Sequence, residues 1–242
     1  MELLNPEETL YRISETESRT KKELVNSKFA RTKLNINTAW NDRTFKDFDN
    51  TPMQPIADKL KDWDFANPNI ASILSMQNGI GKTHLATCLY KKYIHNLISD
   101  SFDLHFKIYV DDIDENTRWF NADMQYLTSK RFEFLSEKKL SLLIQESFNN
   151  KQSSQLDILE RYCKLDFLII DDCFAMKQNE FARQNIFYII DERAEWNNKP
   201  TFITSNLSLK EIADIDTRIA DRIRNSMLFQ ITDKIESYRK NK

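Results

Sequence analysis

Glycine is almost absent from this chain of 242 residues, which contains only Gly79 and Gly81. Average usage of about 7% would give roughly 17 glycines in a chain of this length. Glycine lets backbone amides approach a ligand closely and adopts positive φ angles that other residues avoid. Because a single residue separates the two glycines, we expect the loop around them to need these properties.

Cysteine, long apolar runs and an excess of either charge are also scarce. The chain has three cysteines, Cys88, Cys163 and Cys173, in apolar surroundings without a C-x-x-C pair, which indicates buried free thiols. No apolar run approaches the roughly 18 residues of a membrane span, and residues 1–8 lack a signal sequence, so we expect a cytoplasmic protein. The net charge of −2 leaves any nucleic-acid contact to local patches.

Hydrophobic residues make up 40% of the chain, enough for one domain of about 200 residues with a small appendage. We expect an N-terminal helical extension over residues 1–41 and the main domain over residues 42–242. Residues 19–33 carry six basic side chains against one acidic side chain. This segment is either a solvated helix face or a docking helix for a partner protein or nucleic acid, and the sequence leaves both open.

The two glycines lie between an apolar run of strand type, residues 70–75, and a helical pattern that begins at Thr83. In a P-loop with this order, backbone amides surround the β-phosphate, a lysine reaches the β and γ oxygens, and a hydroxyl binds Mg²⁺. The residues predicted to bind the nucleotide are Asn78, Gly79, Ile80, Gly81, Lys82, Thr83 and His84. Met76 occupies the position of the first glycine of the G-x-x-x-x-G-K-[ST] pattern, so a chance G-K-T before an amphipathic helix is the competing interpretation.

A second motif is the continuous apolar run of residues 167–170, which ends in Asp171 and Asp172. Such a run predicts a strand buried on both faces, and its carboxyl end lies where α/β sheets bind ligands. We expect Asp171 to bind Mg²⁺ together with Thr83, and Asp172 to polarise the attacking water. Asp172 is one methylene shorter than the glutamate used by many ATPases, which predicts slow turnover.

Two further groups of polar residues follow. Residues 199–206 predict another strand, and Asn206 at its end either senses the γ-phosphate beside Asp171 or only forms a turn. Arg218 and Arg222 are four residues apart on a predicted helix, where they either act as an arginine finger or form surface salt bridges.

The remaining elements are predicted from periodicity. Residues 104–110 alternate like a strand, residues 121–150 show two helical patterns, and residues 227–232 form a last strand. The patterns over 121–150 mix lysines with Phe132 and Phe134, which are either core aromatics or a contact surface for single-stranded nucleic acid. The three histidines, His84, His95 and His105, are expected to be structural. The tail of residues 234–242 is too short for a separate lid domain.

Taken together, these motifs resemble the DnaC/IstB-like AAA+ ATPases, which are helicase loaders and transposition helpers. The resemblance covers about residues 43–239 and rests on the motifs at 79–86, 167–172, 204–208 and 218–224, with a further match at 43–48. Phe174 departs from the family, which often has glycine there. The resemblance implies an α/β fold with a five-stranded parallel sheet between helices.

The resemblance also implies a function. It implies ATP and Mg²⁺ as cofactors, an oligomer formed through the ATP interface, and an arginine supplied by the neighbouring subunit, with Arg222 favoured. It further implies a replicative hexameric helicase bound by the N-terminal extension, and single-stranded DNA. The alternatives are a transposition helper on double-stranded DNA and a regulator that binds nucleotide with little hydrolysis; a nucleoside or nucleotide kinase fits the motifs less well.

Deletion of residues 1–33 is expected to leave a folded ATPase domain that no longer binds its protein partner, because the sparse apolar positions of this segment add little to a core. Thermal unfolding and a pull-down from the source cell measure the two properties. A truncated protein that fails to fold, or that retains full partner binding, would contradict an independent docking segment.

Overall fold

The computed structural model describes residues 43–48, 50–66, 69–109, 131–148, 154–175, 180–235 and 237. The chain divides into two compact units, one formed by Ile36–Tyr90 with Arg131–Lys242 and the other by Met1–Asn35 with Lys91–Lys130. Of the second unit, only residues 91–109 are described. The predicted extension over residues 1–41 lies outside the described residues, and the boundary at residue 42 stays a prediction.

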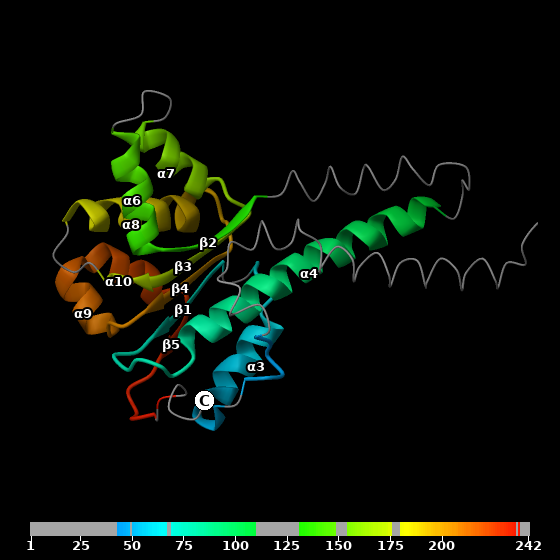
Figure 1. Ribbon diagram of the computed structural model, residues 1–242, viewed down its shortest axis with the longest axis horizontal. Helices are drawn as coiled ribbons and strands as arrows, with labels where there is room; N and C mark the ends of the chain where they lie inside the picture. The colour runs from blue at the N-terminus through cyan, green and yellow to red at the C-terminus, as the bar shows by residue number, and fades with distance from the viewer. Residues whose placement is uncertain are drawn as a thin grey trace, which may run out of the picture. The chain divides into compact units, whose positions relative to one another are not determined.

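A five-stranded parallel sheet forms the centre of the larger unit, as predicted (Figure 1). The strands are β1 (Ile70–Leu74), β2 (Phe132–Ser136), β3 (Phe167–Cys173), β4 (Thr201–Ser205) and β5 (Met227–Gln230). Their spatial order is β2-β3-β4-β1-β5. Because all strands are parallel, the P-loop after β1, the end of β4 and the acidic end of β3 lie along one edge of the sheet.

Helices cover both faces of the sheet (Figure 1). On one face lie α3 (Gln54–Asp62), preceded by the 3₁₀ turn η2 (Thr51–Met53), and the beginning of α4 (Lys82–Tyr109). On the other face lie α6 (Glu137–Ser147), α7 (Gln155–Cys163), α8 (Glu180–Asp191), α9 (Leu209–Ile215) and α10 (Thr217–Arg224). A π-helical turn, η4 (Glu192–Trp196), extends α8.

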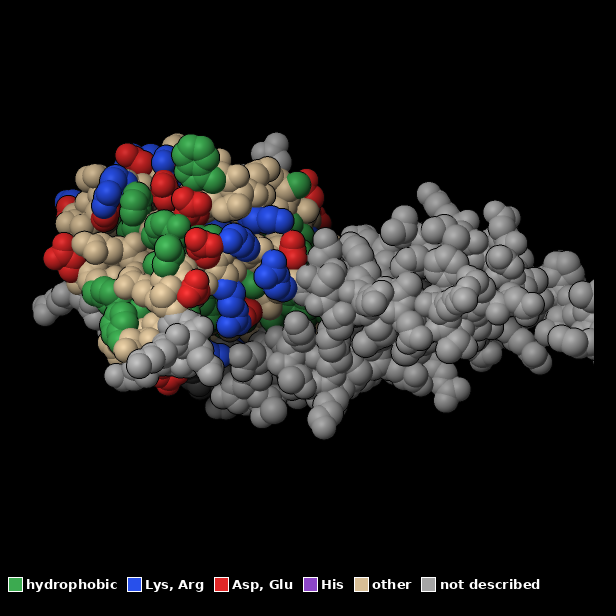
Figure 2. All heavy atoms as spheres, turned by 90° about the horizontal axis from the view of Figure 1, so that it is seen from above, with side chains coloured by type: hydrophobic (Ala, Val, Ile, Leu, Met, Phe, Trp, Pro, Cys, Tyr) green, Lys and Arg blue, Asp and Glu red, His purple; other side chains and the backbone are tan. Residues whose placement is uncertain are grey.

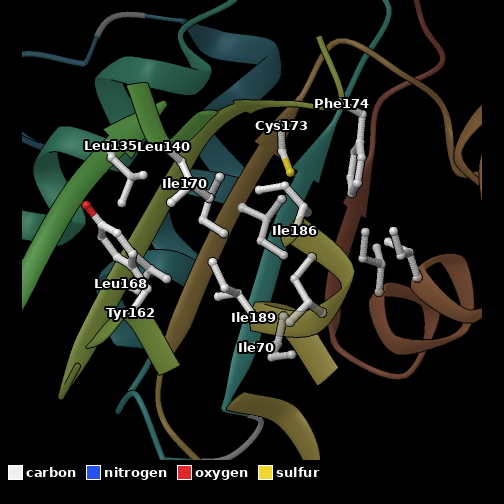
Figure 3. Packing of buried hydrophobic residues seen from close by; sticks show 14 of the residues in the cluster. Ile70, Leu135, Leu140, Tyr162, Leu168, Ile170, Cys173, Phe174, Ile186 and Ile189 are labelled. Carbon is white, nitrogen blue, oxygen red and sulfur yellow. The ribbon is translucent and has the colours of Figure 1, made fainter. Parts of the chain in front are cut away.

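The strand β3 shows why the sheet needs both helical layers. Phe167 contacts the ring of Phe65 at 5.2 Å between centroids, whereas Leu168 and Ile170 belong to the core cluster beneath α6 to α10 (Figure 3). Successive side chains of a strand point to opposite faces, so an apolar strand buries both. The three cysteines are buried free thiols, as predicted.

The predicted strand over residues 104–110 is wrong, because α4 continues through these residues to Tyr109. No glycine or proline interrupts α4, so nothing in its sequence ends the helix before residue 104. A short alternation of apolar and polar residues is compatible with a helix as well as with a strand.

The second strand of the sheet is instead Phe132–Ser136, within the range predicted to be helical. Phe132 and Phe134 are buried in β2 and their rings lie 5.7 and 5.9 Å from the ring of Tyr90. The structure therefore assigns these two aromatic residues to the core and not to a nucleic-acid surface.

Three further observations concern the surface and the ends of the described chain. No helix within the described ranges is long and apolar enough to cross a membrane. Beyond β5, the described residues 231–235 and 237 contain no helix. In the face seen in Figure 2, basic and acidic side chains of the described part are interspersed.

A fully buried arginine joins several elements at the other edge of the sheet, where the strands begin. Arg193 donates hydrogen bonds to the carbonyls of Tyr162, Cys163 and Leu165 at 2.7–3.2 Å, and further ones to Thr201 Oγ1 and Pro200 O. A cation at the carboxyl end of α7 is favoured by the helix dipole and satisfies carbonyls that have no partner within the helix.

Replacing Arg193 with Met is expected to destabilise the protein by about 3 kcal/mol or more, since buried carbonyls lose their donors. Lys164→Met is the matched control, because the Lys164 side chain is 58% exposed and pairs only with Glu160 among the ion pairs of the described chain. Urea unfolding measures both variants. Equal stability of the two would show that the Arg193 network contributes nothing.

Candidate nucleotide-binding site

Both glycines lie in the loop between β1 and α4 and have the backbone that only glycine adopts readily. Their φ angles are 78° at Gly79 and 104° at Gly81. A Cβ atom on Gly81 would lie 2.5 Å from Cε2 of Phe48, so that position excludes a side chain for steric reasons as well. Met76, which replaces the first glycine of the pattern, is not among the described residues with positive φ, so its backbone requires no glycine.

Lys82 is buried within this loop. Its Nζ donates to the carbonyls of Ser75 at 3.0 Å and Gln77 at 2.7 Å, which keeps the ammonium inside the curve of the loop. Lys82 is also the first residue of α4, so the positive end of the helix dipole points at the same place. This combination is suited to bind an anion.

The segment before α3 holds the loop from outside. Asn50 Nδ2 donates to the carbonyl of Ile80 at 2.9 Å, and the buried His84 has Nε2 3.0 Å from the Thr44 carbonyl. The ring of His84 packs edge-on against Phe48 at 5.1 Å. The expectation of a structural role is therefore met for His84, while the side chains of His95 and His105 lie outside the described part.

The strongest link in the site joins the P-loop to β3 and β4. Thr83 Oγ1 donates to the Asp171 carboxylate at 3.0 and 3.2 Å to its two oxygens, and Thr204 Oγ1 donates to Oδ1 at 2.6 Å. Burial raises the pKa of Asp171, an effect that the hydrogen bond from Thr204 opposes and the charge of Asp172 increases. The structure thus brings Thr83 and Asp171 together as predicted, with Thr204 as a further partner.

A β-bulge separates the two carboxylates. Between Ile170 and Cys173, the register of β3 against β4 shifts, and Asp172 has a positive φ of 53°. Asp171 is therefore buried against Thr83, while Asp172 is exposed and accepts a hydrogen bond of 3.0 Å from Asn206 Nδ2. We expected Asn206 beside Asp171; its side chain instead binds the second carboxylate of the pair.

Phe174 follows the bulge and also has a positive φ, 65°, with its side chain 1% exposed. This is the position where the resembling family often has glycine. The chain therefore adopts a backbone typical of glycine with a phenylalanine, and packing of the ring into the core offsets the strain (Figure 3).

The two arginines of α10 lie away from these residues in the same chain, and each has acidic partners. Arg222 bonds Asp191 Oδ1 from Nε and Nη2 at 3.0 and 2.9 Å and lies 3.0 Å from Glu195. Arg218 makes two side-chain bonds to Asp216 and its guanidinium lies 4.0 Å from the centroid of the Phe187 ring. Salt bridges were the alternative interpretation of both residues, and both form them.

Sequence reasoning missed three residues of the site. Thr204 was predicted only as part of a strand. Its hydroxyl also accepts a hydrogen bond of 3.0 Å from the backbone N–H of Asp172. Asn50 holds the loop, and the side-chain amide of Gln77 bonds Asp233 O and accepts from Ile235 N at 2.6 Å. The T-S-N motif was the signal for Thr204, whereas the other two contacts join residues 30 to 158 positions apart and leave no local pattern.

The residues present fit a magnesium nucleotide. A loop that a Cβ would fill, a buried lysine that donates to two carbonyls of that loop and a helix N-terminus suit phosphate oxygens. The adjoining hydroxyl of Thr83 and carboxylate of Asp171 provide the hard oxygen ligands that Mg²⁺ prefers.

Comparison with protein families matches residues 116–230 to the bacterial DnaA ATPase domain. The matched range includes both carboxylates of β3, Asn206 and the two arginines of α10, and it begins after the P-loop.

Three solved structures illustrate the similarity of fold. DnaA bound to AMPPCP and single-stranded DNA has a TM-score of 0.55 at 14% identity, over 83% of this chain and 52% of that one. Domain III of Thermotoga maritima DnaA has a TM-score of 0.55 at 18% identity, over 85% of this chain and 72% of that one. The DnaC helicase loader has a TM-score of 0.54 at 17% identity, over 81% of this chain and 100% of that one.

At these identities the likeness establishes the fold, which agrees with the AAA+ fold expected from the sequence. This chain spans about half the length of the DnaA structure bound to nucleotide and DNA, 52%.

Gly81→Ala is expected to destabilise the protein by about 1–3 kcal/mol, because alanine at a φ of 104° is strained and its Cβ meets Phe48. In a Phe48→Leu background the same substitution is expected to cost less, since the ring that it meets is gone. Chemical unfolding of the two single variants and the double variant tests this, and strictly additive effects would rule out the contact.

Proposed function

We propose that this chain is a DnaC/DnaA-like AAA+ protein that binds and slowly hydrolyses Mg·ATP as a helicase loader in replication initiation. The observation that carries the proposal is the contact of Thr83 with Asp171, at 3.0 Å, which joins two motifs 88 residues apart. Two chance motifs would not be expected to meet at one edge of the sheet.

In this proposal the nucleotide-binding residues are those of the loop and of the first turn of α4: Asn78, Gly79, Ile80, Gly81, Lys82, Thr83 and His84. The backbone amides and Lys82 hold the phosphates, whereas His84 acts through its packing on Phe48. Thr83 and Asp171 hold Mg²⁺, which when bound neutralises charge on the β and γ oxygens. Lys82 must exchange the carbonyls of Ser75 and Gln77 for phosphate oxygens as the nucleotide binds.

Hydrolysis is assigned to the exposed half of the bulge. Asp172 accepts a proton from the attacking water, and Asn206 holds this carboxylate in place and contacts the γ-phosphate. The short side chain of Asp172 gives it less reach than a glutamate, and we therefore propose slow turnover that DNA or a partner stimulates.

The arginine finger is assigned to Arg222, acting on the ATP of an adjacent subunit. Its guanidinium is partly exposed, and charge that develops on the γ-phosphate during transfer would attract it. Arg218, one turn earlier and held on Phe187, is the second candidate.

The proposed partners are a replicative hexameric helicase, bound through residues 1–41, single-stranded DNA and further copies of this chain. The similarity to a helicase loader and to a DnaA bound to single-stranded DNA supports these kinds of partner. We further propose a cytoplasmic location, where such partners act. A transposition helper would prefer double-stranded DNA, so a comparison of binding to the two forms of DNA distinguishes the alternatives.

The test mixes two variants. Lys82→Ala loses its own pocket and Arg222→Ala loses its finger, so each alone is expected to hydrolyse ATP about 10³-fold or more slowly than the wild type. In an equal mixture, about a quarter of head-to-tail interfaces combine an intact pocket with an intact finger, so part of the DNA-stimulated activity returns. Arg224→Ala on the same helix, whose partner is Asp221, is the control and should remain active.

Two results would contradict the proposal. Unchanged binding of a fluorescent ATP analogue by Lys82→Ala would contradict the assignment of the loop as the phosphate site. If Arg222→Ala alone hydrolysed ATP at the rate of the wild type, Arg222 would not be the finger, and Arg218 would be tested next. A regulator with little hydrolysis would bind the analogue but show no turnover even with DNA.

A further inference from the structure

Two exposed apolar side chains occupy positions that the proposed function brings together. Among the described residues, the exposed large hydrophobic side chains are Trp196 (77%), Met76 (66%), Phe148 (61%), Leu156 (53%) and Leu142 (49%). Single exposed hydrophobic residues are common and need no explanation by themselves. The two most exposed of them, Trp196 and Met76, each lie beside a residue of the proposed site.

Met76 borders the phosphate-binding loop. It follows Ser75, which is bonded to the end of β4, and precedes Gln77, whose carbonyl accepts from Lys82. Its side chain nevertheless points to solvent, with 66% of its surface exposed, and its backbone imposes no special geometry. Covering this side chain with another surface would remove apolar area from water.

Trp196 borders the arginine on the other side of the domain. It ends η4, directly after Glu195, whose carboxylate lies 3.0 Å from Arg222. Asp191, the other partner of Arg222, precedes the same turn. Trp196 is therefore attached to the short element that holds the proposed finger.

We infer that Trp196 of one subunit packs against Met76 of the next, so that these two residues form the apolar part of the subunit interface. The inference rests on the proposed function, because Arg222 reaches a neighbour's phosphates only if its surroundings meet the neighbour's P-loop. A thioether against an aromatic ring is a favourable contact, and tryptophan is enriched among residues that dominate interface affinity.

The groups that border the two residues differ. On the Trp196 side Arg222 is paired with Asp191 and Glu195 and Arg218 with Asp216, whereas Met76 borders the loop proposed to hold the phosphates. The two faces are different surfaces of one molecule, so the contact is head-to-tail and each subunit leaves one face open for another. The occupant of the Trp196 surface is thus a second copy of this chain.

The experiment measures assembly of the full chain with Mg²⁺ and AMPPCP by sedimentation velocity over a range of protein concentrations. Trp196→Ala and Met76→Ala are each expected to raise the midpoint concentration of assembly by at least about 10-fold. The double variant should be weakened by clearly less than the product of the two single effects, since both remove the same contact. Leu156→Ala, on α7 and 53% exposed, is the control and should assemble as the wild type does.

A second measurement uses the fluorescence of Trp196. Its accessibility to acrylamide is expected to fall on assembly, and the difference between the wild type and Trp196→Phe isolates this residue from the other tryptophans. Trp196→Ala should bind AMPPCP as tightly as the wild type under conditions where both are monomers, because the residue does not belong to the pocket.

The outcomes separate the inference from the proposed function. If the wild type binds no AMPPCP or does not assemble with it, the proposed function itself fails. If the wild type assembles and both alanine variants assemble with the same midpoint, or their effects multiply independently, the Trp196–Met76 contact is wrong. Loss of single-stranded DNA binding by Trp196→Ala without a change in assembly would assign the tryptophan to DNA and overturn the inference.

Discussion

The rest of the site depends on the carboxylate of Asp171, which is buried between two threonine hydroxyls. Thr83 belongs to the first turn of α4, and Thr204 to β4, so one side chain of β3 fixes the relative position of three elements. Burial alone favours the protonated acid, and the two hydrogen bonds favour the carboxylate. The contact therefore keeps an anionic oxygen beside a hydroxyl at the mouth of the P-loop.

The backbone around this carboxylate is strained, and the chain uses side chains other than glycine to hold it. Asp172 and Phe174 both have positive φ, and no glycine is next to either of them in the sequence. Thr204 accepts from the amide of Asp172, and the ring of Phe174 is buried in the core, so local hydrogen bonding and packing maintain the bulge. Strain of this kind next to a reactive carboxylate is typical of a functional site.

The parts that the sequence predicted are those with a local signature. A continuous apolar run before Asp171 and two glycines before Lys82 indicated both halves of the site, because buried parallel strands and phosphate loops restrict composition. The second strand could not be placed, since residues 104–110 and 132–136 both alternate and only tertiary packing around Tyr90 selects the latter. The bulge lies between β3 and β4, and the contact of Thr204 with Asp171 joins these two strands. The T-S-N motif therefore marked Thr204 but could not show its partner, and no local pattern predicted the bulge.

The acidic partners of Arg222 bear on the proposed assembly of subunits. In the single chain its guanidinium is already satisfied by Asp191 and Glu195, so moving it toward a neighbour's phosphate exchanges one set of anionic acceptors for another. Such an exchange adds little net free energy, because the guanidinium must lose bonds as strong as those it gains. In the proposed assembly, binding between subunits must therefore draw on other contacts. Apolar side chains that are exposed in the single chain would supply it without a comparable loss, and the arginine would contribute to the rate of hydrolysis and not to the affinity.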